Sequence, residues 1–510
     1  MAKFSSKYRI GYGHRITKRL ITAVFICAII ILAASCTTES DTELNISVIN
    51  PGESGESGDD NPEIIWHDSC LEGIILAYLG KTEGPVFRDD LKGIHFIRMN
   101  VWPNGESITE INITMGTSAR TDDPLPPDGW SSYESGIIYE PLHSFEDFAN
   151  FPDLTGLDLC DYETADITQL SVLTKLTDLR LNNNNITDIA PLAGLTELTY
   201  LSLANNNISD IKPLNSLTKL TELWIYNNNI TDIAPLAGLT ELTTLSLRTN
   251  NISDITPLSG LTKLTKLWLY INNITDISPL AGLTELTYLQ LSENSISDVA
   301  PLTGLTKLTK LYLYENNISD ITPLSGLIKL TELWLNDNNI TAISPLAGLT
   351  ELTYLALYTN NISDITPLSG LTKLTNLWLQ KNSISDITPL SGLTNITELQ
   401  LNDNNISDIT PLSDMTELTS LSFDTNNISD ITPLSGLTKM TELWAHKNSI
   451  SDIAPLSGMT NMTYLQLNEN NISDITPLKG MTELAELYLN DNPISDWSPV
   501  QHVETVGGRP

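Results

Sequence analysis

The 510-residue sequence has little of what enzymes and metal proteins use at their sites. It holds four cysteines and six histidines, and the histidines lie far apart, without an H-E-x-x-H motif or a paired-cysteine zinc spacing. No glycine-rich phosphate loop occurs. His67 and Cys70 are the one suggestive pair, and two ligands fall well short of a zinc site. The sequence therefore predicts a protein with no enzymatic activity, no cofactor and no metal.

Positive charge is also scarce. The chain has 27 lysines and arginines against 62 aspartates and glutamates, which gives a formal net charge of −35. Nucleic acid is a polyanion, and a protein that binds it needs a basic patch, which is missing here. Nucleic acid is therefore excluded as the expected partner.

Long apolar runs are absent except for one near the start, at residues 20–35. The charged residues before this run are all basic, and Cys36 follows it directly. This order is typical of a signal peptide. Residues 33–36, AASC, resemble the lipobox of prokaryotic lipoproteins, which implies that Cys36 is lipidated. The alternative is an uncleaved anchor, although 16 apolar residues are short for a spanning helix. Both interpretations predict an exported cell-surface protein that meets the membrane only through its N-terminus.

What the chain does have is a 22-residue repeat, in which a proline recurs without a break in register from Pro191 to Pro499. Each unit has the spacing L-x-x-L-x-L-x-x-N-x-I, which is the leucine-rich-repeat pattern. Leu267 and Leu269 alternate with Trp268, so each unit should contribute one short strand that stacks in parallel on the next. The L-x-L pairs from residue 157 to residue 489 predict an α/β solenoid with about 16 parallel strands.

Two polar columns accompany the leucines. An asparagine recurs every 22 residues from Asn184 to Asn492, and we expect its amide to satisfy backbone groups where the chain turns inward. An aspartate stands three residues before each proline, as Asp254 does, and fails only at Ala342. Such a row could hold calcium, but a carboxylate before a turn more often accepts local N–H bonds.

The predicted organisation has five parts. They are a signal peptide (1–35), a disordered acidic tether (36–62), an N-terminal cap with a divergent region (63–146), the solenoid (147–500) and a C-terminal tail (501–510). Residues 69–80 have the apolar spacing of a cap helix, and residues 93–102 and 108–115 look like strands within an irregular region. Cys70 and Cys160 are a possible disulfide, because exported proteins retain such bonds.

The units L-T-x-L-x-x-L-x-L-x-x-N-x-I-x-D-I-x-P-L, preceded by the helix SCLEGIILAYLG, resemble the internalin type of leucine-rich repeat found on prokaryotic surface proteins. The resemblance covers residues 64–499. It implies a curved solenoid with a parallel sheet on its concave side, used for protein binding and adhesion.

The candidate binding residues point outward from the strands, where they have no part in the core. Aromatic and small residues alternate there, and exposed aromatics rimmed by polar groups are typical anchors of interfaces. The predicted ligand-binding residues are Trp224, Tyr226, Trp268, Tyr270, Tyr312, Tyr314, Trp334, Asp337, Tyr358, Trp378, Trp444 and Tyr488.

Four other interpretations stay open. Duplication of a 44-residue double unit would produce the same alternation without a ligand. Rings about 10 Å apart, two strands along the sheet, could stack on a repeating glycan instead of a protein. The chain could also be a structural component of the cell envelope. The last interpretation is an enzyme with its site in residues 89–150.

Overall fold

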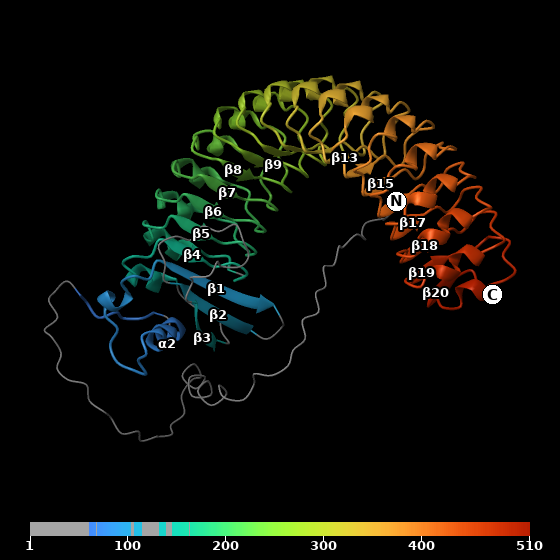
Figure 1. Cartoon of the computed structure of the whole chain (residues 1–510). Helices are drawn as coiled ribbons and strands as arrows, with labels where there is room; N and C mark the ends of the chain where they lie inside the picture. Colours follow the sequence, from blue (N-terminus) through green and yellow to red (C-terminus); the bar gives the residue numbers. More distant parts are fainter. Residues whose placement is uncertain are drawn as a thin grey trace, which may run out of the picture.

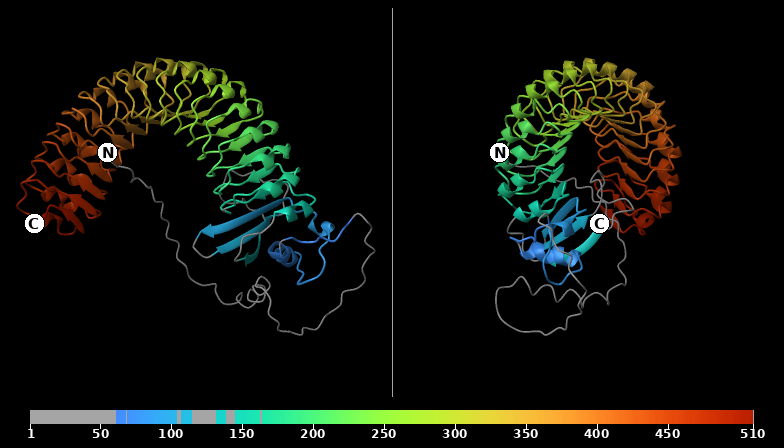
Figure 2. Two further views of the ribbon diagram at one scale, coloured as in Figure 1. Left: turned by 180° about the vertical axis from the view of Figure 1, so that it is seen from behind. Right: turned by 90° about the vertical axis from the view of Figure 1, so that its left-hand side faces the viewer.

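The computed structural model describes residues 61–67, 69–103, 107–114, 132–138, 145–162 and 164–509. The predictions for the signal segment, Cys36 and the tether up to residue 60 lie outside these residues. The described chain forms an arch, with one sheet of twenty strands along the inner side and short helical turns along the outer side (Figure 1). The curvature is visible from both further viewpoints (Figure 2). The predicted curved solenoid is confirmed, and the strands β4 to β19 are the sixteen expected from the L-x-L pairs.

Each repeat strand is three residues long and pairs in parallel with its neighbours, so that Leu267 lies between Leu245 and Leu289. The repeat strands are β4 (Gly156–Asp158), β5 (Asp178–Arg180), β6 (Tyr200–Ser202), β7 (Glu222–Trp224), β8 (Thr244–Ser246), β9 (Lys266–Trp268), β10 (Tyr288–Gln290), β11 (Lys310–Tyr312), β12 (Glu332–Trp334), β13 (Tyr354–Ala356), β14 (Asn376–Trp378), β15 (Glu398–Gln400), β16 (Ser420–Ser422), β17 (Glu442–Trp444), β18 (Tyr464–Gln466) and β19 (Glu486–Tyr488).

The core is a set of apolar columns that run the length of the arch. Leu267, Leu269, Ile274 and Leu280 are fully buried, as are their apolar equivalents except at the C-terminal end, where Ile494 is partly buried. A buried leucine or isoleucine contributes about 1.5–3 kcal/mol. A three-residue strand cannot bury these side chains alone, so the stability of each unit depends on its neighbours.

The asparagine column has the structural role that its position predicts. The amide nitrogen of Asn316 donates to the carbonyls of Leu291 and Leu313 at 3.1 Å and of Tyr314 at 3.3 Å. Its Oδ1 accepts the N–H of Ile296 at 2.9 Å. One side chain therefore satisfies backbone groups of its own unit and of the preceding one.

The outer leg of each unit is a short 3-10 helix, and from residue 190 onward a proline lies in its first turn, where no N–H is needed. These helices are η3 (Glu146–Asn150), η4 (Thr168–Val172), η5 (Ala190–Gly194), η6 (Lys212–Ser216), η7 (Ala234–Leu236), η8 (Thr256–Gly260), η9 (Ser278–Gly282), η10 (Ala300–Gly304), η11 (Thr322–Gly326), η12 (Ser344–Gly348), η13 (Thr366–Gly370), η14 (Thr388–Leu390), η15 (Thr410–Leu412), η16 (Thr432–Gly436), η17 (Ala454–Gly458), η18 (Thr476–Gly480) and η19 (Ser498–Val500).

The aspartate row starts these helices. Asp254 accepts the N–H of Thr256 at 2.8 Å, and hydrogen bonds from the Thr256 hydroxyl and N–H lower the pKa of Asp254. Within the described part of the chain, no group of three or more histidine, cysteine or acidic residues could hold a metal ion. The structure therefore supports the local N–H role of this row.

The N-terminal cap contains α2 (Ser69–Tyr78), η2 (Arg88–Leu91), β1 (Phe96–Pro103), β2 (Ser107–Thr114) and β3 (Ser132–Ile138). The cap helix and the first two strands were expected, but the region is less irregular than predicted. The three strands form an antiparallel meander, and β1 pairs in parallel with β4, so the cap extends the solenoid sheet.

The C-terminal end is closed in a similar way. Residues 505–507, which the sequence places in a tail, form β20 (Thr505–Gly507) and pair with β19. Trp497 packs against the last core layer. Among the described residues, no helix has the length and apolar character needed to span a bilayer.

Candidate functional site

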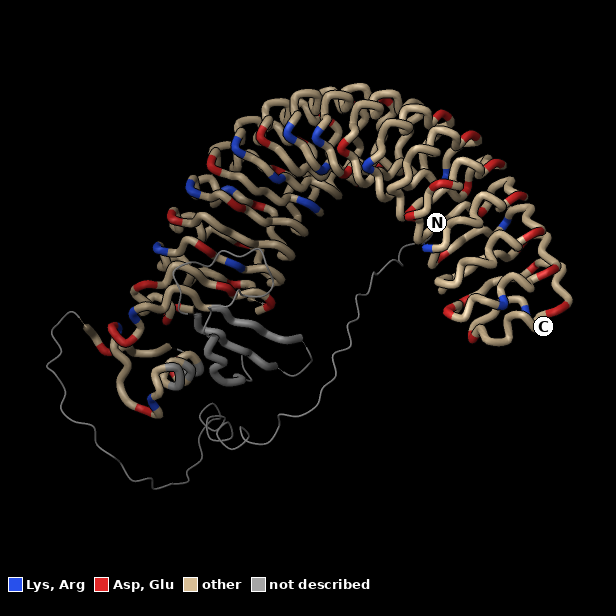
Figure 3. The backbone as a smooth tube through the Cα atoms, viewed as in Figure 1, with Lys and Arg blue, Asp and Glu red and all other residues tan. Residues whose placement is uncertain are grey.

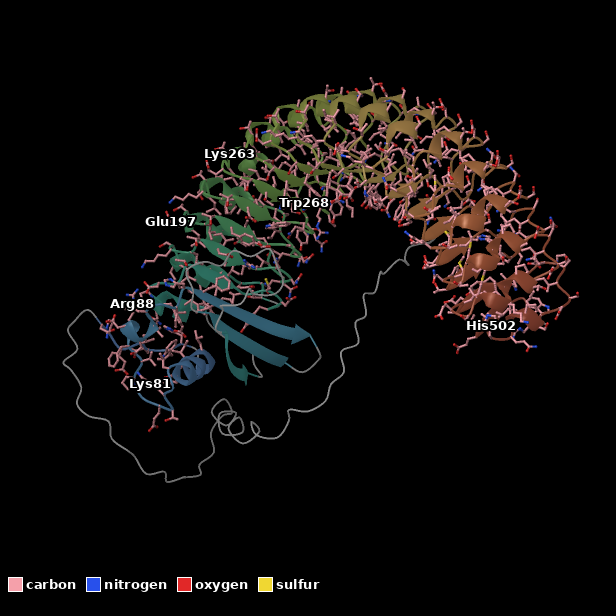
Figure 4. The ribbon with its side chains drawn as sticks, viewed as in Figure 1. Lys81, Arg88, Glu197, Lys263, Trp268 and His502 are labelled. Atoms are coloured by element: carbon pink, nitrogen blue, oxygen red, sulfur yellow. The ribbon has the colours of Figure 1, made fainter. Side chains whose placement is uncertain are left out.

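The concave sheet presents three outward positions in each unit: the first and third residues of the strand and the residue two places after it. Trp268 occupies the third position of β9 and lies on the inner side of the arch, whereas Lys263 and Glu197 lie on the outer side (Figure 4). Eleven of the twelve predicted ligand-binding residues occupy one of these three positions. The exception is Asp337, which lies in the turn three residues after the end of its strand. All twelve are half-buried.

The structure brings most of the predicted aromatics into direct contact. Ring centroids of Trp224 and Trp268 lie 5.2 Å apart, and those of Trp334 and Trp378 lie 5.4 Å apart. Rings from neighbouring outward positions therefore touch across two strands, instead of standing about 10 Å apart as a glycan ladder would require. An unbroken series of ring contacts runs through Trp224, Trp268, Tyr288, Tyr312, Trp334, Tyr354 and Trp378.

Sequence reasoning missed Tyr288, Tyr354 and Tyr464, which stand at the first strand position. Tyr354 stacks on Trp334 with a centroid separation of 4.9 Å, and Tyr464 joins Trp444 to Tyr488. Their signal was available, because the first strand position faces the same way as the third. The unit thus has more outward aromatics than the third position alone shows.

The alternation of large and small residues has a packing cause. Ser246 lies between Trp224 and Trp268 and is 0% exposed, and Ala356 lies between Trp334 and Trp378 and is also 0% exposed. A small residue leaves room for the neighbouring tryptophans to lean together over it. Part of the hydration cost of the tryptophans is removed in this way.

Two glutamates hold the central tryptophans. Trp334 donates its indole N–H to Glu332 at 3.0 Å, and Trp378 donates to Glu398 at 2.9 Å. Burial raises the pKa of Glu332, but hydrogen bonds from Lys310, Tyr312 and Trp334 outweigh it and leave that pKa below its usual value. The indole N–H groups are therefore occupied, and the ring faces and edges are what a partner would meet.

A second group of rings, Trp444, Tyr464 and Tyr488, follows further along the face. The strands β15 and β16 between the two groups carry polar residues. Ser422 donates to Asp424 at 2.7 Å, His446 approaches Asp424 at 3.4 Å, and burial raises the pKa of Asp424. The concave face is thus divided into a long aromatic stretch, a polar step and a short aromatic stretch.

Among the described side chains Cys160 has no disulfide partner, and burial followed by the nearby Asp158 raises the pKa of its thiol. The side chain of Cys70 lies outside the described residues, so a bridge between the two stays a prediction.

Comparison with known proteins assigns the family. The family model described as Leucine Rich repeats (2 copies) matches residues 174–216, 196–238, 218–260, 240–282, 284–326, 328–370, 372–414, 394–436 and 460–502. These matches cover more than half of the chain. The chain belongs to the leucine-rich repeat family.

Among solved structures, this leucine-rich repeat protein is similar to the internalin InlF of Listeria monocytogenes, with 29% identity, a TM-score of 0.51 and coverage of 84% of this chain and 96% of that one. It is also similar to the functional domain of InlJ from the same species, with 26% identity, a TM-score of 0.59 and coverage of 71% and 77%. The ectodomain of the Arabidopsis receptor kinase HAESA shares the fold, at 20% identity and a TM-score of 0.55, over 76% of this chain and 81% of that one. No curated protein matches the chain in sequence.

Proposed function

We propose that this internalin-like protein is a cell-surface module that binds an extracellular protein on its concave face and serves in adhesion. The observation that carries the proposal is the continuous series of half-buried rings from Trp224 to Trp378 on a face that no other described part of the chain covers. Aromatic side chains rimmed by polar groups supply much of the binding energy of protein interfaces. The similarity to two internalins supports the same class.

Affinity capture of partners with the purified protein tests this proposal. Trp334→Ala combined with Trp378→Ala removes the centre of the ring series, and we expect capture of the partner to fall at least fivefold. The matched control is Ile328→Ala, which removes an apolar side chain that is 57% exposed on the outer leg, two residues after η11. Unchanged capture by the double variant, with capture lost in the control, would overturn the concave-face assignment.

The anchor is a separate part of the proposal. The basic start, apolar run and AASC sequence support lipidation of Cys36 in the exported protein. Cys36→Ser should then abolish acyl modification and release the protein from the detergent phase. An unchanged N-terminal peptide mass would instead support the uncleaved anchor.

A glycan ligand, a structural role in the envelope and an enzyme remain alternatives. Direct contact between rings argues against a ladder of separate stacking platforms for sugar rings. Packing of tryptophans over small residues gives the alternation a structural use, which the envelope alternative also accommodates.

A further inference from the structure

A second asparagine column follows the buried one, one residue later in each unit. It lies on the exit flank of the arch, where the chain passes from a strand to the next 3-10 helix, as residues 313–321 do. In most units this asparagine begins the sequence Asn-Ile-Ser or Asn-Ile-Thr, which is the acceptor sequence for N-linked glycans. Ten of these acceptor sequences share one environment, with exposed asparagines at Asn207, Asn229, Asn251, Asn273, Asn317, Asn339, Asn361, Asn405, Asn427 and Asn471.

The column presents its acceptor groups to solvent. Asn317 and Ser319 are exposed, whereas Ile318 between them is buried. Such alternation is that of an extended backbone, so the amide and the hydroxyl lie on the same outward side. Within the described part of the chain, neither the Asn317 amide nor the Ser319 hydroxyl takes part in a hydrogen bond. Both groups that an N-glycan acceptor needs are therefore available.

The fold does not require asparagine at this position. Three units have a serine there and one has a proline, at Ser295, Ser383, Ser449 and Pro493. Each of these units keeps its strand and its 3-10 helix. The buried column one residue earlier, by contrast, is asparagine in every unit from residue 184 to residue 492. The exposed asparagines thus have no part in folding that explains them.

Two more acceptor sequences, Asn395-Ile-Thr and Asn461-Met-Thr, lie on the return flank, where the chain passes from a 3-10 helix back to a strand. There the fold uses both groups. The amide of Asn395 donates to the Thr372 carbonyl at 2.8 Å, and the hydroxyl of Thr397 donates to the Thr375 carbonyl at 3.2 Å. Asn461 is held in the same way. The two sets match the same motif, and the structure separates them.

We propose that the asparagines of the exit flank carry N-linked glycans and that Asn395 and Asn461 do not. The donor is a lipid-linked sugar phosphate, used by a transferase outside the cytoplasm. Transfer breaks the bond between the anomeric carbon of the sugar and the donor phosphate, and joins that carbon to Nδ2 of the asparagine. One amide proton passes to a base of the transferase, and the lipid phosphate leaves. The inference does not depend on a ligand of the concave face.

Glycans on this column would cover one flank of the arch. The backbone N–H of Asn317 donates to the Ile296 carbonyl of the preceding unit at 2.8 Å, so neighbouring acceptors are about one strand spacing, ~4.8 Å, apart. At this density even partial occupancy covers the flank. The concave rings and the return flank stay bare, and a partner reaches the arch from those sides.

Mass spectrometry of the full-length protein, purified from its source cells, tests the inference with site-localising fragmentation of proteolytic peptides. We expect glycan mass on the asparagines of the exit flank and none on Asn395 or Asn461. Asn317→Gln and Ser319→Ala should each remove the glycan from position 317, whereas Ser319→Thr should keep it.

A gain of modification provides the sharper test. Ser295→Asn completes an acceptor sequence with Ser297 and should add one glycan, whereas the matched control Ser295→Gln should add none. Ser383→Asn repeats the test with Ser385 in another unit. Three results would overturn the inference: sequence mass at every asparagine of the exit flank, glycan mass retained on the same peptide in Asn317→Gln, or equal occupancy of Asn395, Asn461 and the column. Absence of any gain in both Ser→Asn variants would do the same.

Discussion

At the scale of single residues, the fold depends on side chains that satisfy backbone groups in every unit. Asn272 and its equivalents do this with four hydrogen bonds each in the interior of the arch. The residue just before each of them has a positive φ, between 52° and 57° from Asn183 to Asp491. Asparagine and aspartate tolerate this left-handed conformation, whereas β-branched residues are strained in it. Each turn therefore contains an asparagine that stabilises it through hydrogen bonds. In some units the residue before that asparagine is β-branched and strained by the positive φ, as Ile271 is.

Asn316→Ala and Asn338→Ala should each lower the free energy of unfolding by about 1–3 kcal/mol, because the truncation leaves buried carbonyl and N–H groups without partners. Urea unfolding measures the change. Asn317→Ala is the control, because Asn317 is exposed and adjoins the same turn. Unchanged midpoints for both ladder variants would contradict the assigned role.

Ile271→Asn should stabilise the protein by about 1 kcal/mol, because it relieves a β-branched residue at a φ of 55°. The reciprocal change Asn227→Ile should destabilise by a similar amount at a φ of 52°. Thermal melts compare the two. A loss of stability in Ile271→Asn would show that burial of the isoleucine side chain, which is 38% exposed, outweighs the strain.

At the scale of elements, the repeat units could be predicted from the sequence, but the pairing of the N-terminal cap with the solenoid could not. Leu267, Leu269 and Asn272 recur at fixed spacing, so one unit predicts all of them. The meander β1 to β3 does not repeat, and no local sequence pattern predicted that β1 would pair with β4. Tyr288 and Tyr354 were missed as site residues for a related reason, because the lean of a ring depends on the size of its neighbours.

Gly156 marks the joint between cap and solenoid. A Cβ at this position would lie 2.1 Å from Cδ2 of Phe96, which pairs with it in register. Gly156→Ala should therefore loosen β1 from β4 and increase amide exchange in residues 96–98, with the repeats from β6 onward unaffected. Adding Phe96→Ala removes the clashing ring and should restore part of the protection. If Gly156→Ala leaves exchange unchanged, the close approach does not constrain the joint.

The aspartate row gives the 3-10 helices a pH dependence. Hydrogen bonds from Thr322 lower the pKa of Asp320 below its ordinary 3.8. A lowered carboxyl pKa contributes stability above the unfolded value, and this contribution disappears as pH falls through the folded value. Asp320→Ala should therefore lower the urea midpoint at pH 7 but not at a pH below the folded pKa of Asp320. Ala342→Asp, at the one unit without the cap, should raise the midpoint at pH 7. Equal effects at both pH values would contradict the assignment.

At the scale of the whole molecule, the arch separates its surfaces by task. Acidic residues predominate along the tube, with basic residues interspersed on the outer leg (Figure 3). There, exposed pairs such as Glu241 and Lys263, 2.7 Å apart, join successive units and contribute little stability each. The concave face carries the rings and the carboxylates beside them. The sequence could place these residues on one face, but it could not predict the contacts that join them.

Photo-crosslinking from the two faces tests the central claim most directly. p-Benzoylphenylalanine in place of Tyr358, on the concave face, should crosslink the partner on irradiation of the protein bound to its target cells. The same residue in place of Ile328, on the outer leg, should not. Crosslinking from position 328 with none from position 358 would contradict the account.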